Sequence, residues 1–351
     1  MLPLEPKSRR KPGYRFAAGA TAFAMCVVML GAFTRLVDAG LGCPDWPVCY
    51  GHVLWPMEAQ EIAAANARFP DTPVESDKTW PEQVHRLLAS SLGLFCIALL
   101  LIAARQRYAF GDHSYPFKLP LLLLAMVILQ GMFGMWTVTL KLWPQVVTAH
   151  LLGGFATLSL LVLLTLRLQG GGWQLGQPQV MAALRTRRYA LVCIGLLLLQ
   201  IALGGWTSSN YAALACPDFP YCQTSWWPQM DFAQGFNLLQ DIGPNYLGGV
   251  MDSAGRTAIH VSHRIGALLV TLAILILCAR LWRLGFNSAR RWARLLLVLL
   301  GLQVALGISN VVFALPLWVA VAHNAGGALL LVTLVGLCQR LFTVSASNTL
   351  A

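Results

Sequence analysis

Residues 43–49 read CPDWPVC and residues 216–222 read CPDFPYC, so one motif occurs twice at a separation of 173 positions. Further pairs of identical residues lie at this same separation along the chain. Repeated matches at one separation indicate an internal duplication. The pairs are Gly31 and Gly204, Thr34 and Thr207, Gln130 and Gln303, Gly134 and Gly307, and His150 and His323.

Eight apolar segments are each long enough, at about 20 residues, to cross a lipid bilayer as a helix. Hydrophobic residues make up 57% of the chain and charged residues only 11%, whereas an average soluble protein is about 25% charged. The composition excludes an ordinary soluble enzyme and predicts an all-α integral membrane protein. The eight predicted transmembrane helices lie near residues 16–36, 83–104, 118–139, 146–168, 188–209, 258–281, 292–313 and 317–341.

The duplication divides the eight predicted helices into two tandem-repeated four-helix bundles. Because four is an even number, both copies enter the membrane in the same direction, and we expect a pseudo-two-fold axis along the membrane normal. The predicted order is a cytoplasmic N-terminal segment (1–15), a first bundle (16–168), a cytoplasmic linker (169–187), a second bundle (188–341) and a cytoplasmic tail (342–351).

The formal net charge of +11 reflects the topology of the chain. Most of the 25 Lys and Arg residues lie in alternate gaps between the apolar segments, and most acids lie in the other gaps. By the positive-inside rule, the basic gaps and both termini are cytoplasmic, which predicts a multi-pass protein of the cell inner membrane. The basic residues are thus assigned to membrane orientation, with the lipid bilayer as partner and no nucleic acid.

Four of the seven histidines occupy matching positions near the extracytoplasmic ends of predicted helices. They are His85 and His150 in the first copy, and His263 and His323 in the second. Ionisable groups inside a membrane are costly, which makes them candidates for function. Two histidines per copy are too few for a zinc site, but they fit the two axial ligands of a haem iron. A hydrogen bond to a neighbouring helix is the alternative for any single histidine.

The residues after the histidines suggest how a flat macrocycle could approach. Small residues three and four positions later would let the ring lie against the helix backbone. A second pattern, L-Q-x-x-x-G, occurs at 129–134, 199–204 and 302–307 and indicates close helix packing, with a direct role in cofactor binding as the alternative. The residues three and four positions after each histidine are Gly153 and Gly154 after His150, Gly326 and Gly327 after His323, and Gly266 and Ala267 after His263. After His85 they are Leu88 and Ala89.

Glu82 breaks the symmetry between the copies, because the matching position in the second copy is His260. It precedes His85 by one helical turn on the same face. A carboxylate there can accept a proton or stabilise a developing cation, so Glu82 is a candidate catalytic residue. The alternative is an acid placed at a helix N-terminus by the helix dipole.

Arg86 and Arg264 directly follow the histidines at 85 and 263. An arginine near the aqueous surface can pair with a haem propionate. The alternative is a side chain that simply extends to the membrane interface.

Two cysteine pairs, Cys43 with Cys49 and Cys216 with Cys222, lie in predicted extracytoplasmic loops. In the oxidising periplasm of a Gram-negative cell, both pairs are expected to form disulfides. They either staple the loops structurally or take part in redox chemistry.

The segments TRLVDAGLGCPDWPVCYG (34–51) and EQVHR (82–86), together with the doubled cysteine loop, resemble the haem A synthase family over essentially the whole chain. The resemblance implies oxidation of a methyl group of haem O to a formyl group, giving haem A for terminal oxidases. It also implies that His85 and His150 hold the substrate haem, with Glu82 catalytic. His263 and His323 would then bind the iron of a haem b cofactor that delivers electrons.

The same resemblance suggests haem O synthase and terminal oxidase assembly factors as partners, an unidentified electron donor, and a homo-oligomer. The main alternative is a bis-histidine membrane cytochrome b that takes electrons from quinol, in which Glu82 would have no task. A membrane thiol oxidoreductase and a haem transporter are further alternatives.

Overall fold

The computed structural model describes residues 10–346, so Lys7, Arg9 and the tail from residue 347 onward lie outside the described residues. Within this range, eight helices are long and apolar enough to cross a membrane. The prediction of an all-α, multi-pass membrane protein is confirmed. The long helices are α1 (Tyr14–Leu36), α3 (Ser76–Ala104), α4 (Lys118–Thr139), α5 (Pro144–Gln169), α6 (Gln177–Ser209), α8 (Ser253–Arg283), α9 (Asn287–Val312) and α10 (Leu317–Phe342).

Short elements connect or flank the long helices. Two parallel two-residue strands, β1 (Gln174–Leu175) and β2 (Ser345–Ala346), pair beside the ends of α5 and α10. The remaining short elements are α2 (Ala59–Arg68), the π-helical η1 (Arg105–Ala109) and α7 (Phe232–Gly235).

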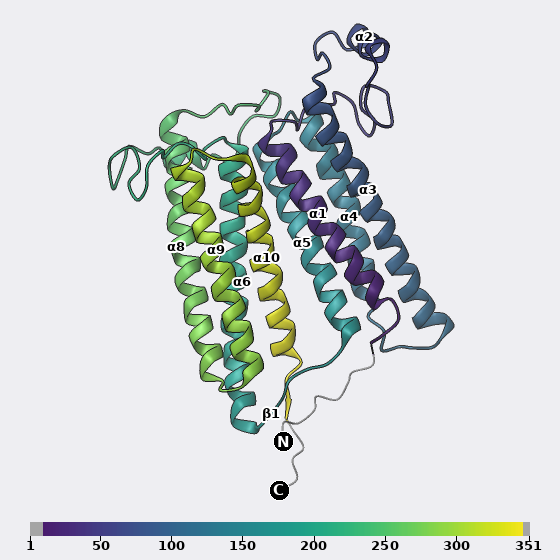
Figure 1. Ribbon diagram of the computed structural model, residues 1–351, viewed down its shortest axis with the longest axis vertical. Coiled ribbons are helices and arrows are strands. Elements are labelled where there is room, and N and C mark those ends of the chain that lie inside the picture. The colour runs from purple at the N-terminus through teal and green to yellow at the C-terminus, as the bar shows by residue number, and fades with distance from the viewer. Residues whose placement is uncertain (1–9, 347–351) are drawn as a thin grey trace.

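The long helices form two groups of four (Figure 1). In the first group, α1 packs on α3, α3 on α4, α4 on α5, and α5 on α1. In the second group, α6 packs on α8, α8 on α9, α9 on α10, and α10 on α6. Each group is therefore a closed ring in which the second and fourth helices stand diagonally opposite. The groups meet through α1, α5, α6 and α10.

Leucines at helical spacing fill the space between the helices. On α5, Leu158, Leu161, Leu164 and Leu168 are almost fully buried, and they lie on one face because they repeat every three or four residues. They belong to one apolar core that includes residues of both groups. Since lipid is as apolar as leucine, this packing depends on shape and van der Waals contact.

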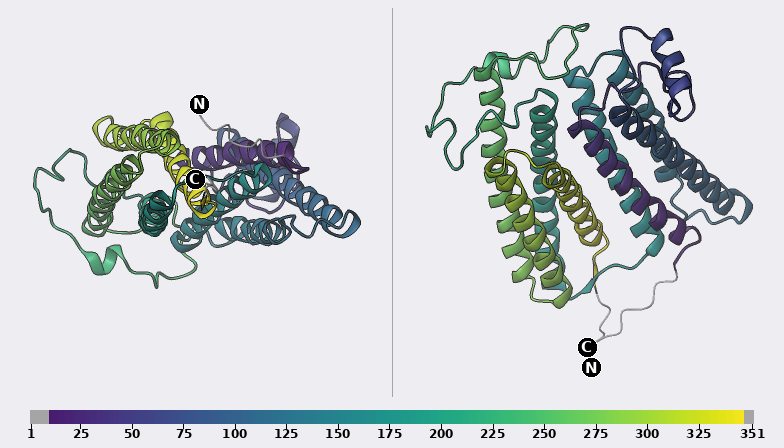
Figure 2. Two further views of the ribbon diagram at one scale, coloured as in Figure 1. Left: turned by 90° about the horizontal axis from the view of Figure 1, so that it is seen from below. Right: turned by 45° about the horizontal axis from the view of Figure 1, so that its top comes forward.

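The cysteine loops and α2 lie at one end of the molecule, and the start of α1 and the short strands lie at the other (Figures 1 and 2). Near the cysteine-loop end, Arg35 of α1 connects the two groups. Its guanidinium donates to the Ser208 carbonyl over 2.7 Å and to the Tyr211 hydroxyl over 3.0 Å. The Tyr211 hydroxyl donates to Asp38 over 2.8 Å.

Two helices, α6 and α3, begin well before the apolar segments that predicted them. Helix α6 starts at Gln177, inside the segment expected to be a linker, with a proline in its first turn. Proline is favoured there because it has no N–H to leave unpaired. Helix α3 starts at Ser76, so Glu82 is its seventh residue and lies beyond the first turn. The helix-dipole explanation of Glu82 therefore loses its basis.

Candidate functional site

Two histidine rings face each other inside the first helix group. His85 of α3 and His150 of α5 come from diagonally opposite helices, and their ring centroids are 6.5 Å apart with the ring planes at 82°. Two imidazoles that bind one metal ion from opposite sides, each at about 2 Å, have centroids about 6 Å apart. The spacing of His85 and His150 thus suits a single metal ion between them.

The second group holds an equivalent pair on its own diagonal helices, His263 on α8 and His323 on α10. Helices α8 and α10 hold the same places in the second ring as α3 and α5 in the first. The structure thus places the four predicted histidines on the pairs of helices expected from the sequence.

Each of the four rings packs against a glycine on the preceding long helix. A Cβ added to Gly31 would lie 2.7 Å from Cε1 of His85, and one added to Gly307 would lie 3.1 Å from Cε1 of His323. The corresponding distances are 3.5 Å for Gly134 with His150 and 3.3 Å for Gly204 with His263. A side chain at Gly31 would therefore displace the His85 ring, one at Gly204 or Gly307 would make a tight contact, and one at Gly134 would make an ordinary contact.

The glycines that follow the histidines have a different neighbour from the one the sequence suggested. Gly153 and Gly326, at the third position after a histidine, are covered by the side chains of Gln130 and Gln303. The expectation of an open backbone face for a macrocycle at these positions is therefore wrong. A glutamine amide from the adjacent helix fills that space.

The donors present fit a haem. The Nδ1 atoms of His85, His150 and His323 are buried and have no hydrogen-bond partner among the described residues. A metal-bound histidine uses one ring nitrogen as ligand and donates from the other. A ring whose Nδ1 has no partner therefore has a nitrogen still available for one of these two tasks. Within residues 10–346 there is no group of three or more His, Cys, Asp or Glu side chains suited to a metal ion. Paired histidines suit an ion whose remaining donors come from a macrocycle.

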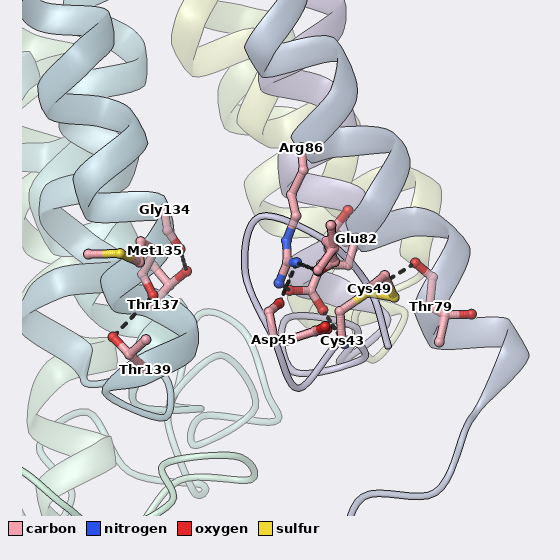
Figure 3. Close-up of polar contacts among 12 residues, drawn as sticks. Cys43, Asp45, Cys49, Thr79, Glu82, Arg86, Gly134, Met135, Thr137 and Thr139 are labelled. Carbon is pink, nitrogen blue, oxygen red and sulfur yellow. Dashed lines mark hydrogen bonds and ion pairs between the residues drawn. A yellow bond between two sulfur atoms is a disulfide. The ribbon is translucent and has the colours of Figure 1, made fainter. Parts of the chain in front are cut away.

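The carboxylate of Glu82 lies buried between its own helix and the first cysteine loop (Figure 3). One oxygen accepts a hydrogen bond of 2.9 Å from the Cys43 backbone N–H, and the other is paired with the guanidinium of Arg86. In the second group, His260 is also buried, and its Nδ1 lies 2.9 Å from the Ala212 carbonyl. The two positions therefore both join a helix to the adjacent loop, but only the first carries an acid.

Arg86 and Arg264 hold the cysteine loops by their backbones. Arg86 donates to the carbonyls of Asp45 and Val48 over 2.7 and 2.8 Å (Figure 3). Arg264 donates to the carbonyls of Tyr221, Cys216 and Asp218 over 2.7, 3.0 and 2.8 Å. A guanidinium suits this task because its donors form a rigid planar fork. Propionate binding by the two arginines stays a prediction.

Both cysteine pairs, Cys43–Cys49 and Cys216–Cys222, are at disulfide bonding distance, as expected. An aspartate folds each loop in the same way. Asp45 accepts from the backbone N–H groups of residues 50 and 51, and Asp218 from those of residues 223 and 224. In the first loop, the pKa of Tyr50 is raised to about 12. Burial of the phenol is the main cause, and the nearby carboxylates of Glu75 and Asp45 add to it.

Comparison with known proteins identifies the family. The family model described as cytochrome oxidase assembly protein (COX15-CtaA) matches residues 14–335. The haem A synthase of Shewanella oneidensis is 45% identical over 333 residues, which cover 93% of this chain and 96% of that protein. The chain belongs to the haem A synthase family. Haem A synthases of Caulobacter vibrioides and Nitrosospira multiformis are 29% and 31% identical, covering 93% and 90% of this chain and 94% and 88% of their own lengths.

Membership of the haem A synthase family makes this chain an oxidoreductase and favours the synthase over a quinol-oxidising cytochrome or a thiol oxidoreductase. Two features of the site were not predicted from the sequence. The loop-binding role of the arginines requires carbonyls that converge only after folding. The glutamine contacts could have been predicted from the sequence. Each helix with the L-Q-x-x-x-G pattern is followed by a helix that has a glycine three residues after its histidine.

The arginine contacts lead to a prediction for this haem A synthase family member. Replacing Arg264 with Lys should expose Cys216–Cys222 to dithiothreitol about tenfold faster, because a single ammonium cannot replace three fixed donors, each worth about 1.5–3 kcal/mol. The rate is measured by alkylation and mass spectrometry. Arg256→Lys on the same helix is the control, since Arg256 binds the Met251 and Gly249 carbonyls outside the disulfide. Equal reduction rates in both variants would contradict the assignment.

Proposed function

We propose that this chain oxidises a methyl group of haem O to a formyl group, with the substrate held by His85 and His150. The activity and the substrate follow from membership of the haem A synthase family. The observation that carries the assignment of the site is the pair of imidazoles 6.5 Å apart on diagonal helices, next to the helix turn that bears Glu82.

The two helix groups are tandem copies of one unit related by a pseudo-two-fold axis along the membrane normal. The matching packing order of the two rings supports this, as do the equivalent arginine and aspartate contacts in the two loops. Two side-chain hydrogen bonds between the groups, Arg35 with Ser208 and Tyr211 with Asp38, each join positions 173 residues apart. Contacts between equivalent positions are expected where a two-fold axis passes through an interface.

The second copy holds a haem b cofactor through His263 and His323. Its supporting features are the paired histidines, their packing against Gly204 and Gly307, and the lack of an acid at position 260. When bound, haem b supplies one-electron redox chemistry. A site for electron transfer needs no proton acceptor, which agrees with His260 in place of a carboxylate.

Glu82 is the residue of this chain that acts on the reacting group. Oxidation of a methyl group releases protons and develops positive charge, and an anionic carboxylate in a low-dielectric site stabilises that charge or accepts a proton. Arg86 and the Cys43 N–H keep the carboxylate oriented. His85 and His150 position the substrate, and the surrounding helices exclude water.

The protein lies in the cell inner membrane with the cysteine loops in the periplasm and both termini in the cytoplasm. Support comes from the sequence, in which most Lys and Arg residues lie in the gaps at the helix ends opposite the cysteine loops. The redox partner of haem b then reaches it from within the bilayer or its surface. Haem O synthase and terminal oxidase assembly factors are the partners that a haem O substrate and a haem A product require.

Chromatography of the haems extracted from the purified protein tests this function. We expect haem b together with haem O or haem A, because the two histidine pairs serve a cofactor and a substrate. Haem b alone would instead support the electron-transferring cytochrome. A preparation from cells lacking haem O is the control, and it should contain haem b only.

A further inference from the structure

A glutamine from the preceding long helix contacts three of the four histidines, at the backbone carbonyl, at the ring or at both, and we call this contact the clamp. Gln130 donates through Nε2 to the His150 carbonyl over 2.9 Å. Gln200 donates to the His263 carbonyl over 2.9 Å, and its Nε2 lies 3.0 Å from Nδ1 of the same ring.

Gln303 reaches the ring of the third clamped histidine, with its Nε2 3.4 Å from Nε2 of His323. In each case the glutamine lies four residues before the glycine that supports the ring. The same element therefore recurs at three sites.

Each clamp needs a partner glycine on the histidine's own helix. A Cβ at Gly153, Gly266 or Gly326 would overlap the amide of the facing glutamine. A larger side chain at these glycines would displace the glutamine amide from its place beside the histidine.

The clamps also carry a cost. The Oε1 atoms of Gln130, Gln200 and Gln303 are buried without a hydrogen-bond partner among residues 10–346. An unpaired buried amide oxygen costs about 1–3 kcal/mol. Its presence at three sites indicates that the clamp has a task.

His85 has neither half of the clamp. Val27 stands four residues before Gly31, where the other helices have glutamine, and Leu88 stands three residues after His85, where they have glycine. Val27 is buried, so an apolar side chain fills the place of the amide.

We propose that His85 is the displaceable ligand of the substrate site, and that its release lets haem O bind and haem A leave. This inference rests on the proposed function. A substrate haem must be exchanged in every cycle, whereas a cofactor haem stays in place. A site for exchange needs one ligand that can swing away and one that stays, and these are His85 and His150. A site for a permanent cofactor needs two fixed ligands, as at His263 and His323.

The test exchanges the clamp between the two copies. In V27Q/L88G the clamp is installed beside His85, and in Q200V/G266L it is removed beside His263. Each purified protein, loaded with haem at both sites, is mixed with excess apomyoglobin, and haem transfer is followed by absorbance. Haem content per chain and helical circular dichroism are measured first.

We expect two phases in the wild-type protein, with the faster phase arising from the substrate site. V27Q/L88G should slow the fast phase about tenfold, and Q200V/G266L should speed the slow phase by a similar factor, since about 1.4 kcal/mol corresponds to tenfold. If V27Q/L88G does not fold, Q200V/G266L still tests whether the clamp slows haem release.

If a folded variant has full haem content and unchanged transfer rates, the proposed role of His85 is wrong. The proposed function is not affected by that result. Absence of haem from the first site in every protein would overturn the proposed function, and this inference with it. The two failures are distinguished by the haem content per chain.

Discussion

Haem A formation should fall by about a hundredfold or more in Glu82→Ala, while the haem content of the protein stays unchanged. The carboxylate is the acidic group one turn from His85, and it contacts the Cys43 N–H and Arg86 but no histidine. Its loss removes a proton acceptor and a negative charge, and it leaves the histidine pair intact. Product is measured by chromatography after single turnover, and haem content by the pyridine haemochrome spectrum.

Glu82 also anchors the cysteine loop, so a second variant separates its two roles. Glu82→Gln removes the charge and keeps one acceptor oxygen, which can serve either the Cys43 N–H or Arg86, so one of the two loop contacts is retained. We expect it to retain loop order and still lose activity. His260→Ala, at the matching position of the second copy, is the control for general disruption. Loss of haem binding with residual activity in Glu82→Ala would refute a catalytic role.

The second large effect is expected at the cofactor site. His263→Ala and His323→Ala should each leave the second site with less than about one tenth of its haem, because losing an axial bond worth several kcal/mol lowers affinity tenfold per 1.4 kcal/mol. Haem A formation should then cease, since no electron relay remains. Haem b per chain and the low-spin absorption bands report the loss directly.

His260→Ala is the matched control, because His260 lies on the same helix but contacts the Ala212 carbonyl. It should keep haem b. The prediction is wrong if His263→Ala retains haem b with an unchanged spectrum, or if His260→Ala loses it to the same extent.

The membrane helices and the histidine pairs could be predicted because they depend on local features. A bilayer fixes the length of an apolar segment, and ionisable residues within one are rare enough to be singled out. The early start of α6 could not be predicted, because Arg185 and Arg187 lie outside the apolar segment of 188–209 yet belong to the helix. A helix that leaves the membrane keeps its hydrogen bonds without needing apolar side chains.

The contacts of the site were harder to predict than its members. Arg86 and Arg264 were recognisable as cations next to two of the paired histidines, but their carbonyl partners lie about 40 residues away along the chain. The glycines after the histidines were correctly selected and wrongly explained. Sequence shows that a side chain is missing at Gly153, whereas only the packed structure shows that Gln130 fills the space.

The contacts between Arg35 and Ser208, and between Asp38 and Tyr211, suggest a history for the duplication proposed above. In a homodimer of a single unit, each residue near the axis would face its own copy, and an arginine there would meet an arginine. Fusion of two genes into one removes that constraint, because each copy can then change alone. The same freedom lets one copy keep an acid at position 82 while the other carries a histidine at 260, so an ancestor with two equal haem sites could become an enzyme with one reactive site.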